Sequence, residues 1–195
     1  MKRTAKVERK TTETNILVEM QLDGEGRADI DTTIPFLDHM LTLFAKHGLF
    51  DVMVRGQGDT HVDYHHLVED LGICFGDVIK EALVGKEGIG RYGSAVVPMD
   101  ESLCLVSLDL SGRPYLVFKA DFDHRTVKDF DPIICEEFFK ALCDHAGITL
   151  HINVMYGRNP HHMIEAVFKA FARSLRKACA VDDRISGVMS TKGTL

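Results

Sequence analysis

The sequence predicts an α+β fold in which one structural unit occurs twice. Two observations indicate this. The motif HHxxE stands at residues 65–69 and again at residues 161–165. The segments before each motif also recur in the same order with similar hydrophobic patterns, which is typical of an internal duplication. We therefore expect a first repeat over residues 1–86 and a second over residues 87–195, packed together as one compact unit.

The first repeat is predicted to contain three strands and two helices. The turn "DGEG" separates two runs with strand character. Pro35 and Gly48 suit the first position and the end of a helix. Apolar residues at helical spacing indicate a second helix around the first HHxxE motif. The expected elements are strands at 14–22, 27–32 and 49–56, and helices at 35–48 and 63–83.

The second repeat follows a glycine-rich segment, "VGKEGIGRYG", and repeats this order of elements with one further strand at its start. Because hairpin turns join several of the strands, we expect a mostly antiparallel sheet in each repeat, with helices on one face. The final segment, 181–195, shows no strong periodicity. The expected elements are strands at 94–99, 102–110, 114–120 and 148–156, and helices at 132–147 and 160–179.

Composition excludes several classes of protein. A formal charge of −6 argues against a nucleic-acid partner, since such proteins usually present basic faces. No apolar run approaches the roughly 20 residues of a membrane helix, and the charged start lacks the apolar stretch of a secretory signal. The five cysteines include no CxxC pair, which is typical of buried thiols in a reducing compartment. We expect a cytoplasmic protein with no membrane partner.

Each HHxxE motif has the geometry of a metal site. Positions i and i+4 share a helix face, so His65 lines up with Glu69, and His161 with Glu165. Adjacent histidines diverge by about 100° on a helix, so each pair suits two different ions better than one. Neighbouring subunits could supply the missing ligands, which would couple metal binding to assembly.

The duplication extends the set of candidate ligands. When the two repeats are aligned, His39 in the helix before the first motif matches Glu137 in the helix before the second. Imidazole and carboxylate ligands without sulfur suit Mn²⁺, Fe²⁺ or Zn²⁺, and two sites of four with open octahedral positions favour Mn²⁺. The candidate metal ligands are His39, His65, His66, Glu69, Glu137, His161, His162 and Glu165.

Several motifs together resemble one known family. The segments "FLDHML", "HHLVEDLGICFG", "RYGSAVVPMDESL", "DLSGRPYLVF", "GRNPHHMIEAVFKAFARSL" and "STKGTL" are similar to those of imidazoleglycerol-phosphate dehydratase, from about Thr12 to the end of the chain. The resemblance implies a fold of the ribosomal-protein S5 domain 2-like type. It implies a carbon–oxygen lyase of histidine biosynthesis that converts imidazole-glycerol phosphate to imidazole-acetol phosphate. It also implies a homo-oligomer of 24 subunits, with two Mn²⁺ in each active site between subunits.

The resemblance also implies roles for individual residues. The eight candidate ligands match the family's metal ligands, although some members carry histidine where this chain has Glu137. Glu13 is the first choice for the acid/base group, and Asp100 and Glu101 stand at the duplicate position. The implied catalytic residues are Glu13, His39, His66 and Glu165. The implied substrate-binding residues are Glu13, His39, His65, Arg91, Arg113, His161 and Lys169, with Ser190 and Lys192 in a C-terminal substrate-binding tail.

The chemistry explains why two metals would be needed. No carbonyl group acidifies the C–H bond that must break, so the imidazole ring is the only electron reservoir of the substrate. Cations on both ring nitrogens would favour an imidazolate, which can expel the neighbouring hydroxyl and give a diazafulvene-like intermediate. A base then removes a proton from the next carbon.

Two other interpretations are possible from the residues alone. The motifs could belong to a non-catalytic metal-binding assembly protein, or to a lyase that acts on a different sugar phosphate. An assembly protein has no need for phosphate-binding cations near its metals. The candidate phosphate ligands therefore favour an enzyme.

Overall fold

The computed structural model describes residues 3–123 and 125–195, and it contains the same arrangement of strands and helices twice. The first half comprises β1 (Thr4–Lys10), β2 (Thr14–Gln21), β3 (Ala28–Asp31), α1 (Pro35–Gly48), β4 (Asp51–Gly58) and α2 (His65–Ala82). The second half comprises β5 (Tyr92–Met99), β6 (Ser102–Asp109), β7 (Tyr115–Lys119), α3 (Ile134–Ala146), β8 (Thr149–Tyr156) and α4 (Pro160–Cys179).

The sheets of the two halves have the same topology. Within the described residues, one four-stranded sheet has the order β1-β2-β4-β3 and the other the order β5-β6-β8-β7. The first three strands of each sheet pair antiparallel, whereas β3 and β7 pair parallel to β4 and β8. The internal duplication and the α+β class predicted from the sequence are therefore confirmed.

Strand β1 was not predicted. It pairs along its whole length with β2, from Thr4 opposite Gln21 to Lys10 opposite Asn15. Its residues, TAKVERK, alternate between half-buried and exposed, so no side chain in it is fully buried. An edge strand with such a polar composition carries little of the apolar alternation by which strands are recognised in a sequence.

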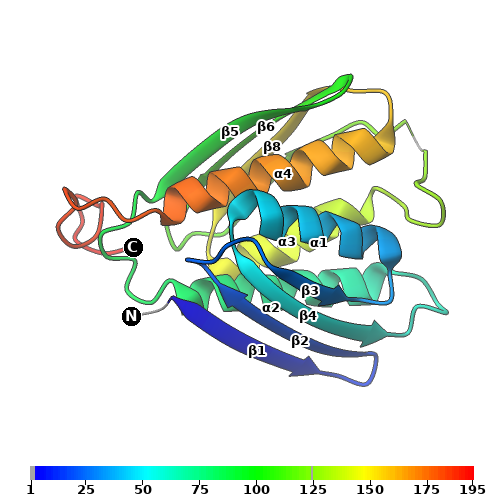
Figure 1. Cartoon of the computed structure of the whole chain (residues 1–195), viewed down its shortest axis with the longest axis horizontal. Coiled ribbons are helices and arrows are strands. Elements are labelled where there is room, and N and C mark those ends of the chain that lie inside the picture. Colours follow the sequence, from blue (N-terminus) through cyan, green and yellow to red (C-terminus); the bar gives the residue numbers. More distant parts are fainter. Residues whose placement is uncertain (1–2, 124) are drawn as a thin grey trace.

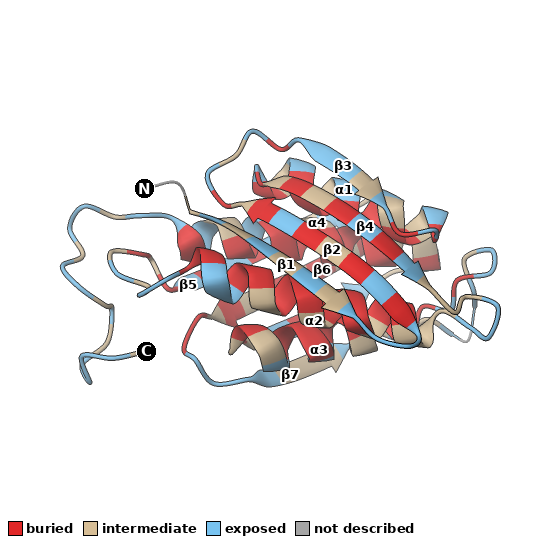
Figure 2. Cartoon of the chain, turned by 90° about the horizontal axis from the view of Figure 1, so that it is seen from below, coloured by how far each residue is buried: buried red, intermediate tan, exposed pale blue. Residues whose placement is uncertain are grey.

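Helices α1 to α4 lie between the two sheets, which form the outer layers of the molecule (Figure 1). Helix α2 packs against β1 and β2, and α4 packs against β5 and β6. The two halves meet through their helices, because α1 contacts α4 and α3 contacts α2. Each sheet buries one face, and Figure 2 shows buried and exposed residues alternating along β2 and β4.

Both halves contribute to one hydrophobic core. Buried residues from Ile16 to Cys179 belong to a single cluster, in which Phe44 of α1 stacks on Phe171 of α4 at 5.6 Å between ring centroids. All five cysteines are buried free thiols, as expected, and burial raises the pKa of Cys74 to about 12. No helix in the described part of the chain has the length and apolar character needed to span a membrane.

Two glycines bring α2 and α3 unusually close together. A Cβ atom at Gly72 would stand 2.4 Å from the carbonyl oxygen of Phe138, and one at Gly76 would stand 2.7 Å from that of Leu142. Only glycine therefore fits at these two positions of α2. The spacing matters for the site, because α2 carries the first HHxxE motif and α3 carries Glu137.

Candidate metal and substrate site

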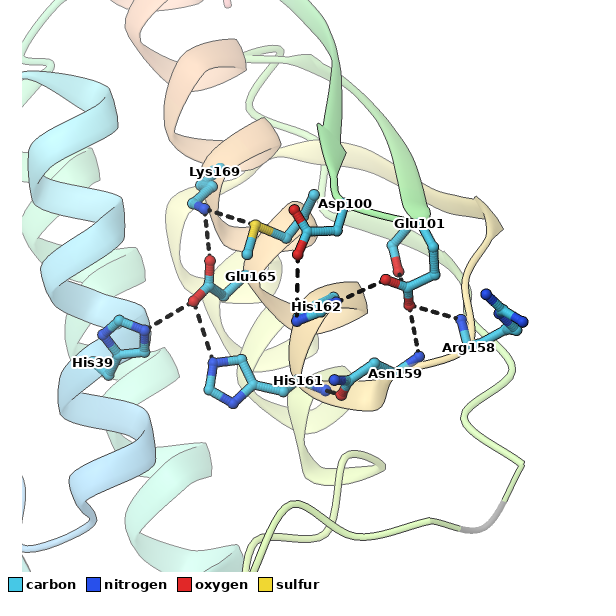
Figure 3. Close-up of polar contacts among 11 residues, drawn as sticks. His39, Asp100, Glu101, Arg158, Asn159, His161, His162, Glu165 and Lys169 are labelled. Atoms are coloured by element: carbon cyan, nitrogen blue, oxygen red, sulfur yellow. Dashed lines mark hydrogen bonds and ion pairs between the residues drawn. The ribbon is translucent and has the colours of Figure 1, made fainter.

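The contact between α1 and α4 brings three candidate ligands from different halves together. His39 Nε2 lies 2.9 Å from Glu165 Oε1, and His161 Nε2 lies 3.2 Å from the same oxygen. The second pair is the predicted i, i+4 pair on one helix face. All three ligand atoms lie within 4.8 Å of one another, and Figure 3 shows both imidazoles pointing at the carboxylate. We call His39, His161 and Glu165 the cross-half group.

The Glu165 carboxylate is buried but remains charged. Its side chain is 8% exposed, and Lys169 Nζ donates to Oε2 at 2.6 Å. Burial raises the pKa of Glu165, but hydrogen bonds from Lys169, His39 and His161 outweigh this effect and hold the pKa at about 2. A buried anion that faces two imidazoles is a suitable environment for a divalent cation.

The equivalent residues of the other half do not converge in the same way. Within residues 3–123 and 125–195, the ligand atoms of His65, Glu69 and Glu137 form no group as tight as the cross-half group. All three residues are half-buried. His65 lines an open pocket of about 360 Å³ together with Tyr64 and Asp129. The structure thus brings together three of the eight candidate ligands and leaves their counterparts in the other half apart.

The second histidine of each motif turns away from its neighbour. The rings of His65 and His66 lie 6.2 Å apart at 88°, and those of His161 and His162 lie 6.2 Å apart at 81°. This is the divergence that the helix geometry predicted. We call His66 and His162 the divergent histidines.

Each divergent histidine contacts a carboxylate through Nδ1. His66 Nδ1 lies 3.0 Å from Asp59 Oδ2 and 3.8 Å from Glu13 Oε2. His162 Nδ1 lies 2.7 Å from Glu101 Oε2. These carboxylates raise the pKa of both imidazoles, chiefly through Asp59 at His66 and through Glu101 at His162.

Asp59 is a member of the site that the sequence comparison missed. It follows β4, and it forms a possible metal-binding group with Glu13 and His66. The position that matches it in the second half is Gly157, so the comparison of the repeats carries no signal for it. Its other oxygen, Oδ1, is buried and has no hydrogen-bond partner among the described residues.

The candidate phosphate ligands fall at two ends of the molecule. Lys169 lies beside the cross-half group. Arg91, by contrast, donates its backbone N–H to the carbonyl of Ala178 at the far end of α4. Since 17 residues separate His161 from Ala178 and a helix rises 1.5 Å per residue, roughly 25 Å separate the two ends.

The arginine end of the molecule is organised around one acidic residue. Arg91 donates to both oxygens of Asp109, at 2.7 and 3.0 Å, and to the carbonyl of Met189 in the C-terminal tail at 2.8 Å. Arg113 Nη2 lies 3.7 Å from Asp109 Oδ2. Ser190 follows Met189 directly, and its hydroxyl accepts the N–H of Lys192. Four predicted substrate-binding residues therefore share the end opposite the histidines: Arg91, Arg113, Ser190 and Lys192. We call this end the arginine end and the other the histidine end.

Comparison with known proteins decides the family. A model of the imidazoleglycerol-phosphate dehydratase family matches residues 32–175, most of the chain. The chain belongs to the imidazoleglycerol-phosphate dehydratase family. The dehydratase of Syntrophus aciditrophicus is 59% identical over 194 residues, which cover 99% of this chain and 98% of that protein. That of Clostridium acetobutylicum is 58% identical and covers 100% of this chain and 98% of its own length.

Solved structures of dehydratases have the same fold. The crystal structure of the Staphylococcus aureus dehydratase superposes with a TM-score of 0.81 at 40% identity, over 92% of this chain and 99% of that one. The dehydratase of Pyrococcus furiosus, solved in complex with (S)-C348, superposes with a TM-score of 0.84 at 36% identity, over 97% of this chain and 100% of that one. Membership of the family identifies the chain as a hydro-lyase of histidine biosynthesis, and it sets aside the two alternative interpretations.

Proposed function

We propose that the chain dehydrates imidazole-glycerol phosphate to imidazole-acetol phosphate at sites that are shared between copies of the chain. Two divalent cations, Mn²⁺ by preference, would bind in each site. The observation that carries this proposal is the cross-half group, where two imidazole nitrogens and one carboxylate oxygen from opposite halves converge within 4.8 Å.

The donor set fits a divalent cation such as Mn²⁺. Two nitrogens and one oxygen, with no sulfur, match the ligand preference of this ion and leave octahedral positions open for a further ligand and for substrate. Glu165 supplies a buried negative charge, which Lys169 partly compensates. The equivalent set of the other half, His65, Glu69 and Glu137, offers one nitrogen and two carboxylates for the second cation. The pairing of α2 with α3 repeats that of α1 with α4 and supports this assignment.

A fourth protein ligand for each cation would come from a neighbouring copy. The divergent histidines present their Nδ1 atoms to carboxylates of their own chain. Their Nε2 atoms are the ring nitrogens left to bind a cation held by another subunit. His66 would complete one site and His162 the other, which ties metal binding to assembly.

The positions of the proposed phosphate ligands also indicate that each site is shared between copies of the chain. Arg91, Arg113 and the tail residues Ser190 and Lys192 stand roughly 25 Å from the histidines of their own chain. A three-carbon chain with an imidazole at one end and a phosphate at the other does not span that distance. We therefore assign the arginine end of one copy and the histidine end of another to the same substrate, in an assembly for which we propose 24 subunits. Arginine suits this role because its planar fork binds phosphate with two hydrogen bonds.

The reaction needs one carbon–oxygen bond and one carbon–hydrogen bond to break. Cations bound at both ring nitrogens would supply stabilisation of the imidazolate form, whose electrons can expel the adjacent hydroxyl through a diazafulvene-like intermediate. His39, His65 and His161 would orient the ring through the cations that they hold. Glu13 lies next to His66 and is exposed, so its carboxylate can reach the substrate and remove the proton from the next carbon. Lys169 would bind the substrate beside Glu165.

Turnover by the purified, metal-loaded chain tests the proposal. With Mn²⁺, the wild type should convert imidazole-glycerol phosphate. His66→Ala and Glu165→Ala should each lower turnover by at least about 100-fold, because each removes a ligand. Glu81→Gln serves as the control, since Glu81 is an exposed carboxylate at the other end of α2. Absence of product from a wild-type preparation shown to contain its metal would reject the proposed function.

A further inference from the structure

Glu101 is held in a fixed orientation by hydrogen bonds from its own turn and from the segment before α4. The backbone N–H groups of Arg158 and Asn159 donate to its Oε1 at 3.1 and 2.8 Å. The hydroxyl of Ser102 also donates to Oε1, at 3.1 Å. Glu101 lies in the turn between β5 and β6, whereas Arg158 and Asn159 directly precede α4. The carboxylate thus joins this turn to the start of the helix that carries the second HHxxE motif (Figure 3).

The second oxygen of Glu101 faces one ring nitrogen of His162. Oε2 lies 2.7 Å from Nδ1, which is a short, charge-assisted hydrogen bond. A carboxylate can only accept, so Nδ1 must carry the hydrogen atom. In the neutral imidazole the lone pair then resides on Nε2. Asp100 Oδ2 lies 3.8 Å from that Nε2, beyond hydrogen-bond distance, and adds negative charge where a cation would approach.

From this geometry we infer that Glu101 is a positioning residue, which fixes the tautomer of His162 so that its Nε2 is free to bind the cation of a neighbouring subunit. The inference rests on the proposed function, since it assigns a cation to His162. A carboxylate behind a metal-binding imidazole also orients the ring and increases its basicity. Glu101 therefore acts through His162 and needs no contact with the substrate.

The first half contains the same arrangement, built from a residue at an unrelated position. Asp59 Oδ2 lies 3.0 Å from Nδ1 of His66, so this ring is also held with Nε2 outward. Asp59 follows β4, whereas Glu101 precedes β6, and so duplication does not explain the coincidence. Glu13, the true counterpart of Glu101, stands farther from its histidine, at 3.8 Å. In both divergent histidines, a carboxylate thus accepts the hydrogen bond from Nδ1. Because Asp59 takes this role at His66, Glu13 is left available for the substrate.

Replacing Glu101 by glutamine should reverse the tautomer. The two backbone N–H groups require an oxygen at the Oε1 position, so the amide nitrogen of Gln would face His162 Nδ1. An amide nitrogen donates, and Nδ1 must then accept, which places the hydrogen on Nε2 and blocks the metal. Alanine, in contrast, leaves the ring free to choose either tautomer but leaves the two backbone N–H groups without their acceptor. Glu101→Gln should therefore bind metal more weakly than Glu101→Ala, whereas its fold should be the more stable of the two.

The experiment compares metal-stripped wild type, Glu101→Gln, Glu101→Ala and the exposed control Glu81→Gln. Each protein is titrated with Mn²⁺, and the metal bound per chain is counted after dialysis. We expect Glu101→Gln to weaken one of the two sites by roughly 10–100-fold and Glu101→Ala to weaken it less. Thermal unfolding of the stripped proteins should show Glu101→Gln to be the more stable of the two. Glu81→Gln should match the wild type in both measurements.

Nitrogen NMR of histidine-labelled, metal-stripped protein reports the tautomer directly. At alkaline pH, where the ring is neutral, His162 should carry its hydrogen on Nδ1 in the wild type and on Nε2 in Glu101→Gln. An unchanged tautomer, or a Glu101→Gln protein that binds Mn²⁺ as tightly as the wild type, would overturn the inference and leave the proposed function standing. A wild type that binds no Mn²⁺ would reject both.

Discussion

Arg91 stabilises the fold in addition to the phosphate-binding role that we propose for it. The family resemblance assigned it to the phosphate, and its surroundings show that it also stabilises the structure. Its side chain is only 11% exposed and donates to both oxygens of Asp109. Its third contact, to the carbonyl of Met189, attaches the C-terminal tail to the second sheet. Asp109 therefore orients the proposed phosphate ligand, and through it the contact with the tail.

Removing Asp109 should destabilise the chain. Asp109→Ala leaves a buried guanidinium without its partner, which we expect to lower the free energy of unfolding by roughly 2–4 kcal/mol. Urea denaturation of the metal-free protein measures this. Asp29→Ala is the matched control, because Asp29 pairs with Arg55 in an exposed ion pair whose loss should have no measurable effect. Equal losses in the two variants would show that burial of the Arg91–Asp109 pair does not matter.

The candidate ligands could be found from the sequence because they occur twice. His39, His161 and Glu165 lie on helices whose periodicity is clear, and duplication marked them as related. Asp59 has no counterpart in the second half and lies in a loop, so neither repetition nor periodicity indicates it. Which of the eight ligands converge within one chain also could not be predicted. It depends on how the helices of the two halves cross, which is a property of the packing.

Among the elements, the pair α2 and α3 depends on glycine for its close packing. Gly72 and Gly76 allow α2 to approach the backbone of α3 more closely than any side chain would permit. This approach brings α3, which carries Glu137, against the helix that carries the first HHxxE motif. The distance between the two helices therefore sets the geometry of the second proposed metal site.

Gly72→Ala should weaken both the fold and that site. The added methyl group would meet Phe138 O at 2.4 Å, so the helices must separate. We expect a loss of about 1–3 kcal/mol from overpacking, although alanine favours a helix by about 1 kcal/mol. Thermal unfolding and Mn²⁺ titration are the measurements. Glu81→Ala, on the exposed face of the same helix, should keep or slightly raise stability. A Gly72→Ala chain that is as stable as the wild type would show that the close approach is not required.

Most elements could be predicted because their sequence pattern matches their burial. The four helices and seven of the eight described strands lie within the expected ranges or a few residues from them. The exception, β1, obtains its structure from pairing with β2. The residues of β1 alone do not indicate which strand they pair with. The order of strands in each sheet has the same cause, since register and pairing are decided by neighbours.

At the scale of the whole molecule, the separation of the two ends predicts how mutants combine. His161→Ala damages the histidine end, and Arg113→Ala damages the arginine end, where the side chain is 65% exposed and can be removed without harm to the core. Each variant alone should be inactive. If the two are stripped of metal, mixed in equal amounts and reassembled with Mn²⁺, one site in four receives two intact ends. Activity should then recover to about a quarter of the wild-type value.

The matched control is a mixture of His161→Ala with Glu165→Ala. Both changes damage the same end, so no combination of copies restores it and the mixture should stay inactive. A first mixture that also remained inactive after reassembly would show that a single chain builds the whole site.

The shared core has a consequence for how such a protein could originate. In each half one helix, α2 or α4, covers most of the sheet, and both helices of the half pack against helices of the other half. A polypeptide of half this length would expose the apolar helix faces that now pack on the other half, and it would have to self-associate to bury them. Two such copies facing each other would restore these helix contacts, and the equivalent of the cross-half group would then be shared between two molecules.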